Sequence, residues 1–518
     1  MSTHREGVDL LNRREFVVTA ASGAAIAGMP RHAPAAEPVR NAPGRPYNLI
    51  VVGGGNAGMP AAIFAAKRGA RVLMIEAAGQ LGGTLHLSSG QMSAGGTTLQ
   101  KSKGIEDSGQ LHYDDVMRIS KNTADRDIVR LATLNGADTF DWLMDNGFDV
   151  HPEHPILGTT HEPYSRPRYV WGKNGGRSIL RILNAQLQPE IDAGRVKVLL
   201  DTKAKALTTN RSGAVTGVVA EDANGARTRY LAENILLTAG GCASNKEMFE
   251  ITDAPLKNYN DSSYPYSQGE GIELGRSVGG YVRNGEHHLM LLGGILENDD
   301  YPSPMVQGFR PWPPHRPPYE IYVNTAGKRF MPEDVPSHDA SEEALTRQSG
   351  VVYWIVFDDQ AFYQAPQVMN SRRWTREQYG AMFNNRPFFH KADTLEALAK
   401  LAGFDSAGFV QTVADYNEAY ESGGDALGRK TIPTAIASTP YYAVKAHGWK
   451  FMSFGGLAAD GQLRLIRKDG TPIPNLYAAG EILGAGTTMG RSHVGGMCVT
   501  PALTLGRLLG QKMLSFRT

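Results

Sequence analysis

Cysteine is scarce in this chain, which excludes several kinds of redox centre. Cys242 and Cys498 are the only two cysteines among 518 residues. They form no CxxC pair, no CxxCH haem-attachment motif and no iron–sulfur spacing. We therefore expect no haem, no iron–sulfur cluster and no metal site, and we expect both cysteines to be packed core residues.

An excess of charge of one sign and a long apolar run are also absent. Lysine and arginine number 53 and aspartate and glutamate 52, which gives a net charge of +1. This balance does not favour nucleic acid as a partner. A modestly apolar run, residues 17–29, is too short to span a bilayer, and no other candidate span is present. We expect a small-molecule substrate.

The first residues resemble a transport signal rather than part of a fold. Asn12-Arg13-Arg14-Glu15-Phe16-Val17 is similar to a twin-arginine export motif, and residues 33–36 are small enough to suit cleavage. Twin-arginine export carries folded proteins, which fits a protein that binds its cofactor before transport. We expect residues 1–36 to be an export signal and the mature protein to be periplasmic. The alternative is a disordered basic tail.

Glycine, in contrast, is abundant, and its most informative use is a turn between two apolar strands. Residues 49–52 predict a buried parallel strand that ends at Gly53-x-Gly55-x-x-Gly58. A helix-compatible stretch, a second apolar strand at 71–75 and Glu76 follow. Such a βαβ unit is typical of dinucleotide binding, with the pyrophosphate on the helix N-terminus and the acid on a ribose hydroxyl. The alternative is a glycine turn in an ordinary α/β protein.

More than one domain is expected for a chain of this length. Residues 233–241 predict another strand that breaks at glycines beside the first, and the same α/β character returns after residue 450. Between 288 and 450, prolines and aromatic residues are dense. We predict an α/β protein with a Rossmann-like domain, its parallel sheet discontinuous in sequence (46–287 and 451–518), and an inserted α+β domain at 288–450.

Taken in order, these segments resemble the flavoprotein family that includes fumarate reductase and succinate dehydrogenase flavoproteins and 3-ketosteroid Δ1-dehydrogenase. The resemblance implies FAD, a two-part FAD-binding domain and a capping domain that closes the substrate against the flavin. The matching pieces are 53–58 with Glu76, 82–90, 238–241, 269–280, 324–330, and 476–481 with the closing helix.

The resemblance assigns residues to both ends of FAD. Glu76 would bind the adenosine ribose and Glu481 a ribityl hydroxyl. The closing helix would direct its N-terminus, near Val499 and Thr500, at the flavin and stabilise the reduced anion. The alternatives are a surface charge at Glu481 and ordinary turn residues at positions 88 and 89. The other residues expected along the cofactor are Gly53, Gly55, Asn56, Ala57, Gly58, Gly82, Gly83, Thr84, Ser88, Ser89, Gly90, Ala239, Gly240 and Gly241.

Succinate dehydrogenases bind their flavin covalently through a histidine of this same glycine-rich region. His86 lies close to that position but not at it. We expect non-covalent FAD and a packing role for His86, with covalent attachment as the alternative.

The sequence departs from fumarate reductases where those enzymes hold a dicarboxylate. Residues 331–339, which follow the Gly-Lys-Arg-Phe motif, contain no arginine to donate a proton, and His493 replaces another family arginine. His288 is a candidate for the first clamp histidine. A dicarboxylate needs at least two fixed cations, and Arg491 alone is a poor substitute. Fumarate reduction is therefore disfavoured.

The last segment is more similar to the ketosteroid dehydrogenase pattern. Residues 500–506 resemble its closing helix, and His493 falls where that group has an active-site tyrosine, with one residue missing between the two. His493 is a candidate proton-transfer group because imidazole titrates near working pH, and His338 is a second candidate. The alternatives are a structural histidine in a glycine-rich turn and a capping or surface histidine.

Three hypotheses follow. The favoured one is an exported FAD enzyme that removes or adds two hydrogens across a carbon–carbon bond next to a carbonyl or carboxyl, by hydride transfer at flavin N5. The second is a fumarate- or urocanate-type reductase that holds an unsaturated carboxylate with Arg491. The third is an electron-carrier flavoprotein docked to a partner subunit. In each, an external donor or acceptor exchanges electrons with the flavin.

Overall fold

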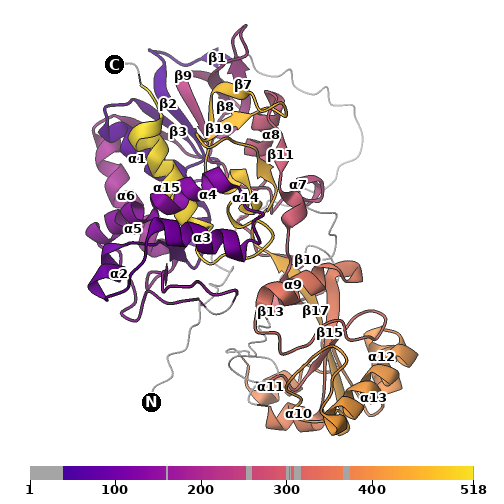
Figure 1. Ribbon diagram of the computed structural model, residues 1–518. Coiled ribbons are helices and arrows are strands. Elements are labelled where there is room, and N and C mark those ends of the chain that lie inside the picture. The colour runs from indigo at the N-terminus through magenta and orange to yellow at the C-terminus, as the bar shows by residue number, and fades with distance from the viewer. Residues whose placement is uncertain are drawn as a thin grey trace, which may run out of the picture.

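The computed structural model describes residues 39–158, 161–252, 259–298, 303, 305–308, 317–365 and 374–516. Figure 1 shows a larger body that combines early and late parts of the chain, and a smaller body built from its middle. The predicted export signal, residues 1–36, lies outside the described residues. No helix among the described residues is long and apolar enough to cross a membrane.

A nine-stranded sheet forms the larger body, and its central strands are parallel. β2 (Tyr47–Val52) pairs with β3 (Val72–Ile75) on one side and β9 (Arg227–Leu237) on the other. β20 (Pro472–Ala478) returns from the end of the chain to pair with β9. The predicted parallel sheet, discontinuous in sequence, is therefore confirmed. The sheet also contains β1 (Arg40–Asn41), β6 (Val196–Leu199), β7 (Lys203–Thr209), β8 (Val215–Glu221) and β19 (Arg464–Ile466).

The first and last helices of the larger body pack against each other. α1 (Gly58–Lys67) contacts both α15 (Val499–Leu508) and the π-helical turn η6 (Leu509–Met513). A Cβ atom at Gly506 would lie 2.1 Å from the Ala57 carbonyl oxygen, so this close approach requires glycine. The predicted closing helix thus lies directly behind the glycine-rich turn.

The remaining helices and short strands of the larger body surround this core. Two small ladders pair β4 (Met92–Ser93) with β5 (Tyr169–Val170), and β11 (Val282–Arg283) with β18 (Gly456–Leu457). The helices are η2 (Gly83–His86), α2 (Thr98–Ser102), α3 (Gly109–Ile119), α4 (Arg126–Leu134), α5 (Gly136–Asp145), α6 (Gly176–Asp192), α7 (Lys246–Thr252), α8 (Glu270–Ser277), η3 (Gly285–His287), η5 (Glu481–Leu483) and α14 (Ala485–Met489).

The smaller body, the cap, contains a seven-stranded, mostly antiparallel sheet. Its strands are β10 (Tyr259–Asp261), β12 (Leu291–Leu296), β13 (Met305–Gly308), β14 (Ile321–Val323), β15 (Val352–Asp358), β16 (Phe389–Ala392) and β17 (Tyr441–Lys450). β10 pairs in parallel with β17, although it precedes the expected start of this domain at residue 288. The helices are α9 (His338–Thr346), η4 (Ser349–Val351), α10 (Asp359–Gln364), α11 (Arg376–Gly380), α12 (Leu395–Ala402) and α13 (Ser406–Ser422).

Alternation along β15 explains why the cap is dense in aromatic residues. Tyr353, Ile355 and Phe357 belong to one apolar core, and Trp354 and Val356 belong to a second core on the other face. A strand buried on both faces needs large apolar side chains at every position. In Figure 1, α9 and β10 lie at the end of the cap nearest the larger body. This end of the cap meets the cofactor-binding body.

Candidate active site

A cavity of about 420 Å³ runs from the glycine-rich turn after β2 to the α9 end of the cap. Its walls come from the ends of β2, β3 and β9, from segments within 83–91, 156–171 and 480–505, and from the cap. The carboxyl ends of parallel strands are the usual ligand-binding edge of such a sheet. The cavity therefore has a nucleotide end in the larger body and a substrate end at the junction with the cap.

The nucleotide end depends on glycines that cannot be replaced without a backbone clash. Gly53 has φ +103°, and a Cβ atom there would lie 2.5 Å from the Thr238 carbonyl oxygen. A Cβ atom at Gly58 would lie 2.0 Å from the Gly53 carbonyl oxygen. Gly58 does not line the cavity; it begins α1 and permits the close packing of helix and strand. The residues of this turn that line the cavity are Gly53, Gly55, Asn56 and Ala57.

Glu76 lines the cavity at the end of β3, where the sequence predicts the ribose-binding acid. Its carboxylate accepts hydrogen bonds from the backbone N–H of Gly54 at 2.7 Å and of Ala78 at 2.8 Å. Burial raises the pKa of Glu76, and the backbone N–H groups offset only part of this effect. These two bonds hold the carboxylate in place beside the turn.

Two observations show that the nucleotide end fits a dinucleotide cofactor. A Cβ atom at Gly55 would meet nothing closer than 4.0 Å, so open space lies beside the backbone at the start of α1. The Asn56 Oδ1 atom is buried and has no hydrogen-bond partner within the part of the chain that the structure describes. A buried acceptor left unpaired costs about 1–3 kcal/mol, so a bound hydroxyl or N–H group would be stabilising. FAD would occupy this space along the helix N-terminus.

The expected flavin-end residues divide into cavity-lining and supporting positions. Gly82 supports the turn, because a Cβ atom there would contact Leu180 and His86. A Cβ atom at Gly90 would lie 2.6 Å from the Gly175 backbone, and one at Gly241 would lie 2.0 Å from the Ser453 hydroxyl oxygen. The predicted residues that do line this part are Gly83, Thr84, Ser88, Ser89, Ala239, Gly240, Glu481 and Val499.

Thr500 does not reach the cavity, which corrects its predicted role beside the flavin. Its side chain is fully buried, and its hydroxyl oxygen accepts a hydrogen bond from the Ser93 backbone N–H at 2.9 Å. Val499, one residue earlier, lines the cavity instead. The first turn of α15 therefore faces the cavity through Val499 and the neighbouring Cys498.

His86 also lies outside the cavity lining. Its Nε2 atom is 2.9 Å from the Leu81 carbonyl oxygen, so the ring is turned toward its own turn. This placement matches the expected packing role. Cys498, in contrast, is exposed and lines the cavity, so the expectation of a packed core residue is wrong for Cys498, whereas Cys242 is buried.

Three histidines meet at the substrate end of the cavity. His493, on the loop between α14 and α15, packs beside His161 with ring centroids 4.2 Å apart and ring planes tilted by 36°. His338, the first residue of α9, has its ring 5.7 Å from that of His161. All three line the cavity, so the structure brings together two histidines predicted from sequence and one that was missed.

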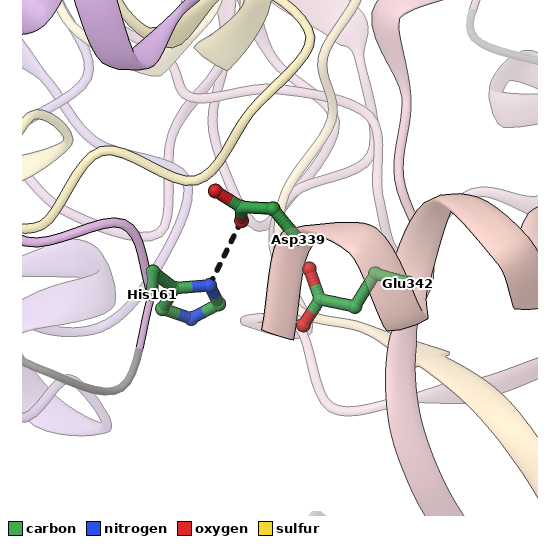
Figure 2. A group of neighbouring side chains, drawn as sticks. All are labelled: His161, Asp339 and Glu342. Carbon is green, nitrogen blue, oxygen red and sulfur yellow. Dashed lines mark hydrogen bonds and ion pairs between the residues drawn. The ribbon is translucent and has the colours of Figure 1, made fainter. Parts of the chain in front are cut away.

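Two carboxylates of α9 face these histidines. Figure 2 shows Asp339 and Glu342 on adjacent turns, with Asp339 joined to His161. Asp339 Oδ1 accepts from His161 Nδ1 at 2.9 Å and from the His493 backbone N–H at 3.2 Å. Burial alone would raise the pKa of Asp339, but the hydrogen bond and charge of His161, together with His493, lower it below its ordinary value. Asp339 is therefore an ionised carboxylate that ties the cap to two loops of the larger body.

This group also contains donor types that metal ions accept. One potential ligand atom from each of His161, Asp339 and Glu342 lies within 4.8 Å of the other two. Among the described residues, this is the group of His, Asp and Glu side chains close enough to hold a metal ion. The bond between His161 and Asp339 already joins two of the three. The arrangement is that of a hydrogen-bonded acid–base pair.

Arg491 and His288 are not among the residues that line the cavity. Arg491 is exposed, and its backbone N–H donates to Thr123 Oγ1. The cavity lining contains His493 but not Arg491, so the described residues do not support the prediction that Arg491 holds a carboxylate. His288 is buried between Phe249 and Phe454, with ring centroids 5.0 Å from each, and lines a small adjoining space.

The walls of the substrate end are mainly aromatic and apolar. Among the described residues that line the cavity there is no arginine. Lys203 contributes the one lysine of that lining, and its Nζ lies 3.7 Å from Glu270 at the nucleotide side. The large apolar side chains of the cavity lining include Ile156, Tyr169, Trp171, Leu291, Leu292, Trp449, Phe451 and Met452.

Buried polar pairs support the loop that carries His493. The Tyr164 hydroxyl donates to the Gly495 carbonyl oxygen and lies 3.1 Å from the Ser93 hydroxyl. Nearby, the fully buried Arg168 pairs with Asp107 at 2.7 Å and Asp115 at 2.5 Å. These pairs leave no buried charge uncompensated and fix the segment that contains His161.

Sequence reasoning missed His161, Asp339, Glu342 and the aromatic wall. His161 lies in an irregular segment between α5 and α6 that matches no motif. The one available signal is that this segment also contains His151 and His154. The contact between His161 and Asp339 joins residues 178 positions apart and becomes visible only when the cap is placed.

Comparisons with known proteins agree with this architecture. The family model described as "FAD binding domain" matches residues 48–498. A fumarate reductase (cytochrome) of Shewanella frigidimarina is 27% identical over 483 residues, which covers 92% of this chain and 78% of that protein. A vinyl phenol reductase of Lactiplantibacillus plantarum is 27% identical over 483 residues, covering 90% and 96%.

Solved structures share the fold. The open conformation of a flavocytochrome c3 fumarate reductase matches with a TM-score of 0.69 at 26% identity, covering 91% of this chain and 78% of that one. A 3-ketosteroid delta1-dehydrogenase from Sterolibacterium denitrificans matches with a TM-score of 0.71 at 20% identity, covering 90% and 99%, which shows a common fold. This chain therefore belongs to the FAD binding domain family, and it is an FAD-dependent oxidoreductase that acts on carbon–carbon bonds.

Proposed function

We propose that this enzyme reduces a carbon–carbon double bond conjugated to a carbonyl group, in a neutral substrate that carries a ring. The observation that carries the proposal is the composition of the substrate end. Three histidines and two carboxylates lie there, and no arginine lines the cavity within the described residues. A dicarboxylate would need fixed guanidinium groups, whereas a neutral conjugated carbonyl needs an apolar wall and one proton source.

The chain's own residues supply orientation and the proton. When bound, FAD supplies the hydride chemistry. The wall of Tyr169, Trp171, Trp449 and Phe451 would stack a ring and exclude water. A histidine of the junction would hold a proton within reach of the substrate carbon next to the carbonyl. His493 is the histidine that the sequence predicts for this role.

The relatives support reduction as the direction. The sequence resembles a ketosteroid dehydrogenase pattern but leaves the direction open, whereas the fumarate, urocanate and vinyl phenol enzymes among the relatives are all named reductases. Vinyl phenol is itself a neutral aromatic alkene. The likeness to ketosteroid dehydrogenases is at 20–22% identity and supports only the fold. Dehydrogenation of a saturated ketone would use the same residues in reverse.

Anaerobic reoxidation of the reduced enzyme tests the proposal. The holoenzyme is reduced with dithionite, freed of excess reductant, and mixed with benzalacetone, cyclohexenone, methyl cinnamate or fumarate. The neutral conjugated carbonyls should restore the oxidised flavin spectrum and yield saturated products. If fumarate alone reoxidises the flavin, the substrate class is wrong. If only saturated ketones bleach the oxidised enzyme, the direction is wrong.

Export and an external electron donor complete the proposal. The Arg13-Arg14 motif supports export by the twin-arginine route, and the absence of haem and iron–sulfur motifs supports an electron donor outside the chain. N-terminal sequencing of the protein from periplasm should find a start near residue 36. An intact N-terminus on protein confined to the cytoplasm would contradict export.

A further inference from the structure

The three histidines at the substrate end differ in what holds them. His161 Nδ1 lies 2.9 Å from a carboxylate oxygen of Asp339, whereas His493 contacts the same oxygen through its backbone N–H. A carboxylate at Nδ1 sets the tautomer and orientation of an imidazole and stabilises its protonated form. Asp339 is thus bonded to the His161 ring and, at His493, to the backbone.

We infer that His161 is the proton-transfer residue of the proposed reduction and that Asp339 is its positioning residue. This inference rests on the proposed function and deepens it. It moves the proton-transfer role from His493 to a histidine without a sequence motif. In this assignment, the His493 ring packs beside the His161 ring.

The placement of His161 supports this role. Its side chain is 16% exposed and lines the cavity, so it is shielded from bulk water but open to a ligand. Figure 2 shows the second ring nitrogen, Nε2, on the side of the ring away from Asp339. The proton on Nε2 is therefore not engaged by the carboxylate that holds Nδ1. The His493 ring, 4.2 Å from the His161 ring, limits its tilt.

The carboxylate of Asp339 fixes the His161 ring through its hydrogen bond to Nδ1 at 2.9 Å. Asp339 is 6% exposed, and its ionised form is compensated by the bonds from His161 and the His493 backbone. Among the described residues, the other titratable groups near His161 include His338 and Glu342 of α9 and His493 of the loop. Removal of the Asp339 carboxylate would thus leave the His161 ring without the charged acceptor that orients Nδ1.

The step balances. The carbon–carbon π bond breaks, and two new C–H bonds form. The carbon next to the carbonyl takes a proton from His161 Nε2, and the other carbon takes the hydride, so the substrate is reduced by two electrons. His161 is left neutral and regains its proton from solvent through the cavity. The two electrons are returned by the external donor of the FAD enzyme.

This assignment makes the site dependent on the cap. Asp339 belongs to α9 of the cap, while His161 and His493 belong to separate loops of the larger body. The proton donor is therefore complete only when α9 lies against both loops. A sequence motif in either body alone therefore cannot predict the His161–Asp339 pair.

The test compares His161→Gln, Asp339→Asn and His493→Gln in the holoenzyme, with His151→Gln as a control outside the cavity. All four should keep the flavin spectrum. His161→Gln should lower kcat at least 100-fold, as expected for loss of a general acid. Asp339→Asn should lower kcat more than KM changes and move the alkaline limb of the kcat profile to lower pH. His493→Gln should lose less than tenfold.

A second readout does not depend on turnover. Diethyl pyrocarbonate reacts with neutral imidazole, so carbethoxylation of His161, followed by peptide mass spectrometry, reports its protonation in the holoenzyme. Asp339→Asn should speed this reaction near neutral pH, and His151 should react alike in both proteins. The wild-type enzyme could reduce no conjugated carbonyl while His161 still reacts faster in Asp339→Asn. The proposed function would then be wrong, but the interaction between Asp339 and His161 would be supported.

Three results would overturn the inference. Near wild-type kcat in His161→Gln would exclude His161 as the donor. An unchanged pH limb and carbethoxylation rate in Asp339→Asn would leave Asp339 with a merely structural role. Activity lost on treatment with EDTA and restored by Zn²⁺ would show that His161, Asp339 and Glu342 hold a metal ion instead.

Discussion

The two ends of the central cavity differ in which atoms form them: mainly backbone at the nucleotide end, and side chains at the substrate end. The nucleotide end is made largely of backbone, with glycines at positions such as Gly53 and Gly58 where a Cβ atom would collide with main-chain oxygens. The substrate end is made of side chains, with His161, Asp339 and His493 supplied by three segments far apart in sequence. One end has a local motif, and the other has only a tertiary arrangement.

This difference explains how one cofactor fold serves many substrates. Backbone constraints tolerate almost no substitution, so the nucleotide end must look alike wherever the cofactor is the same. Side chains at the substrate end can change without disturbing the sheet, because they come from loops and from the cap.

The largest effect is expected from Gly53→Val, which should abolish FAD binding. Gly53 has φ +103°, and a Cβ atom would lie 2.5 Å from the Thr238 carbonyl oxygen, so the turn must open. The ratio of flavin to protein absorbance after purification measures the outcome. Gly54→Ala is the matched control, because its Cβ meets the end of the flexible Leu81 side chain at 2.3 Å. Full flavin content in Gly53→Val would show that the turn is not rigid.

Glu76→Gln should weaken FAD binding about tenfold, which corresponds to about 1.4 kcal/mol. The carboxylate accepts from two backbone N–H groups, and an amide can replace only part of this acceptor capacity. Equilibrium dialysis or fluorescence titration of the apoprotein with FAD measures the change. An unaltered dissociation constant would remove Glu76 from the cofactor site.

A stability effect without a cofactor effect is expected for Thr500→Val. The substitution removes the acceptor of the Ser93 backbone N–H and should lower the free energy of unfolding by about 1 kcal/mol. Flavin content should remain at the wild-type value, because Thr500 does not line the cavity. Urea denaturation and flavin absorbance check the two parts. Loss of flavin from a stably folded variant would restore the role that the sequence predicts for Thr500.

The smallest effect is expected from Arg491→Ala. Arg491 is exposed and lies outside the cavity lining, so kcat and KM should change by less than about twofold, as is usual for surface substitutions. Steady-state kinetics with a conjugated ketone and with a conjugated carboxylate provide the check. A tenfold rise in KM for the carboxylate alone would mean that Arg491 reaches the substrate.

The sequence predicts the nucleotide end well because that end is local. The strand, the glycine turn, the helix and Glu76 are contiguous, and each has a backbone reason for its residue type. The dense aromatic segment also predicts a second body, and its residues form the two apolar cores of the cap. Of the two residues predicted at the start of α15, Val499 lines the cavity and Thr500 does not.

The substrate end could be predicted only in part. His493 and His338 were identified, and the structure places both in the lining. The sequence offers Arg491 as a cation for an unsaturated carboxylate, but Arg491 is exposed and is not among the cavity-lining residues. His161 and Asp339 carry no motif, and their contact depends on how the cap sits on the larger body.

The central claim is that the substrate end serves a neutral conjugated carbonyl and not a dicarboxylate. The most direct measurement is the rate of anaerobic flavin reoxidation in stopped flow, with benzalacetone and fumarate compared at equal concentration on the same reduced enzyme. We predict that benzalacetone reoxidises the flavin at least about 100 times faster than fumarate does. This factor is on the order of the rate lost when one general acid–base contact is missing. Faster reoxidation by fumarate would contradict the account.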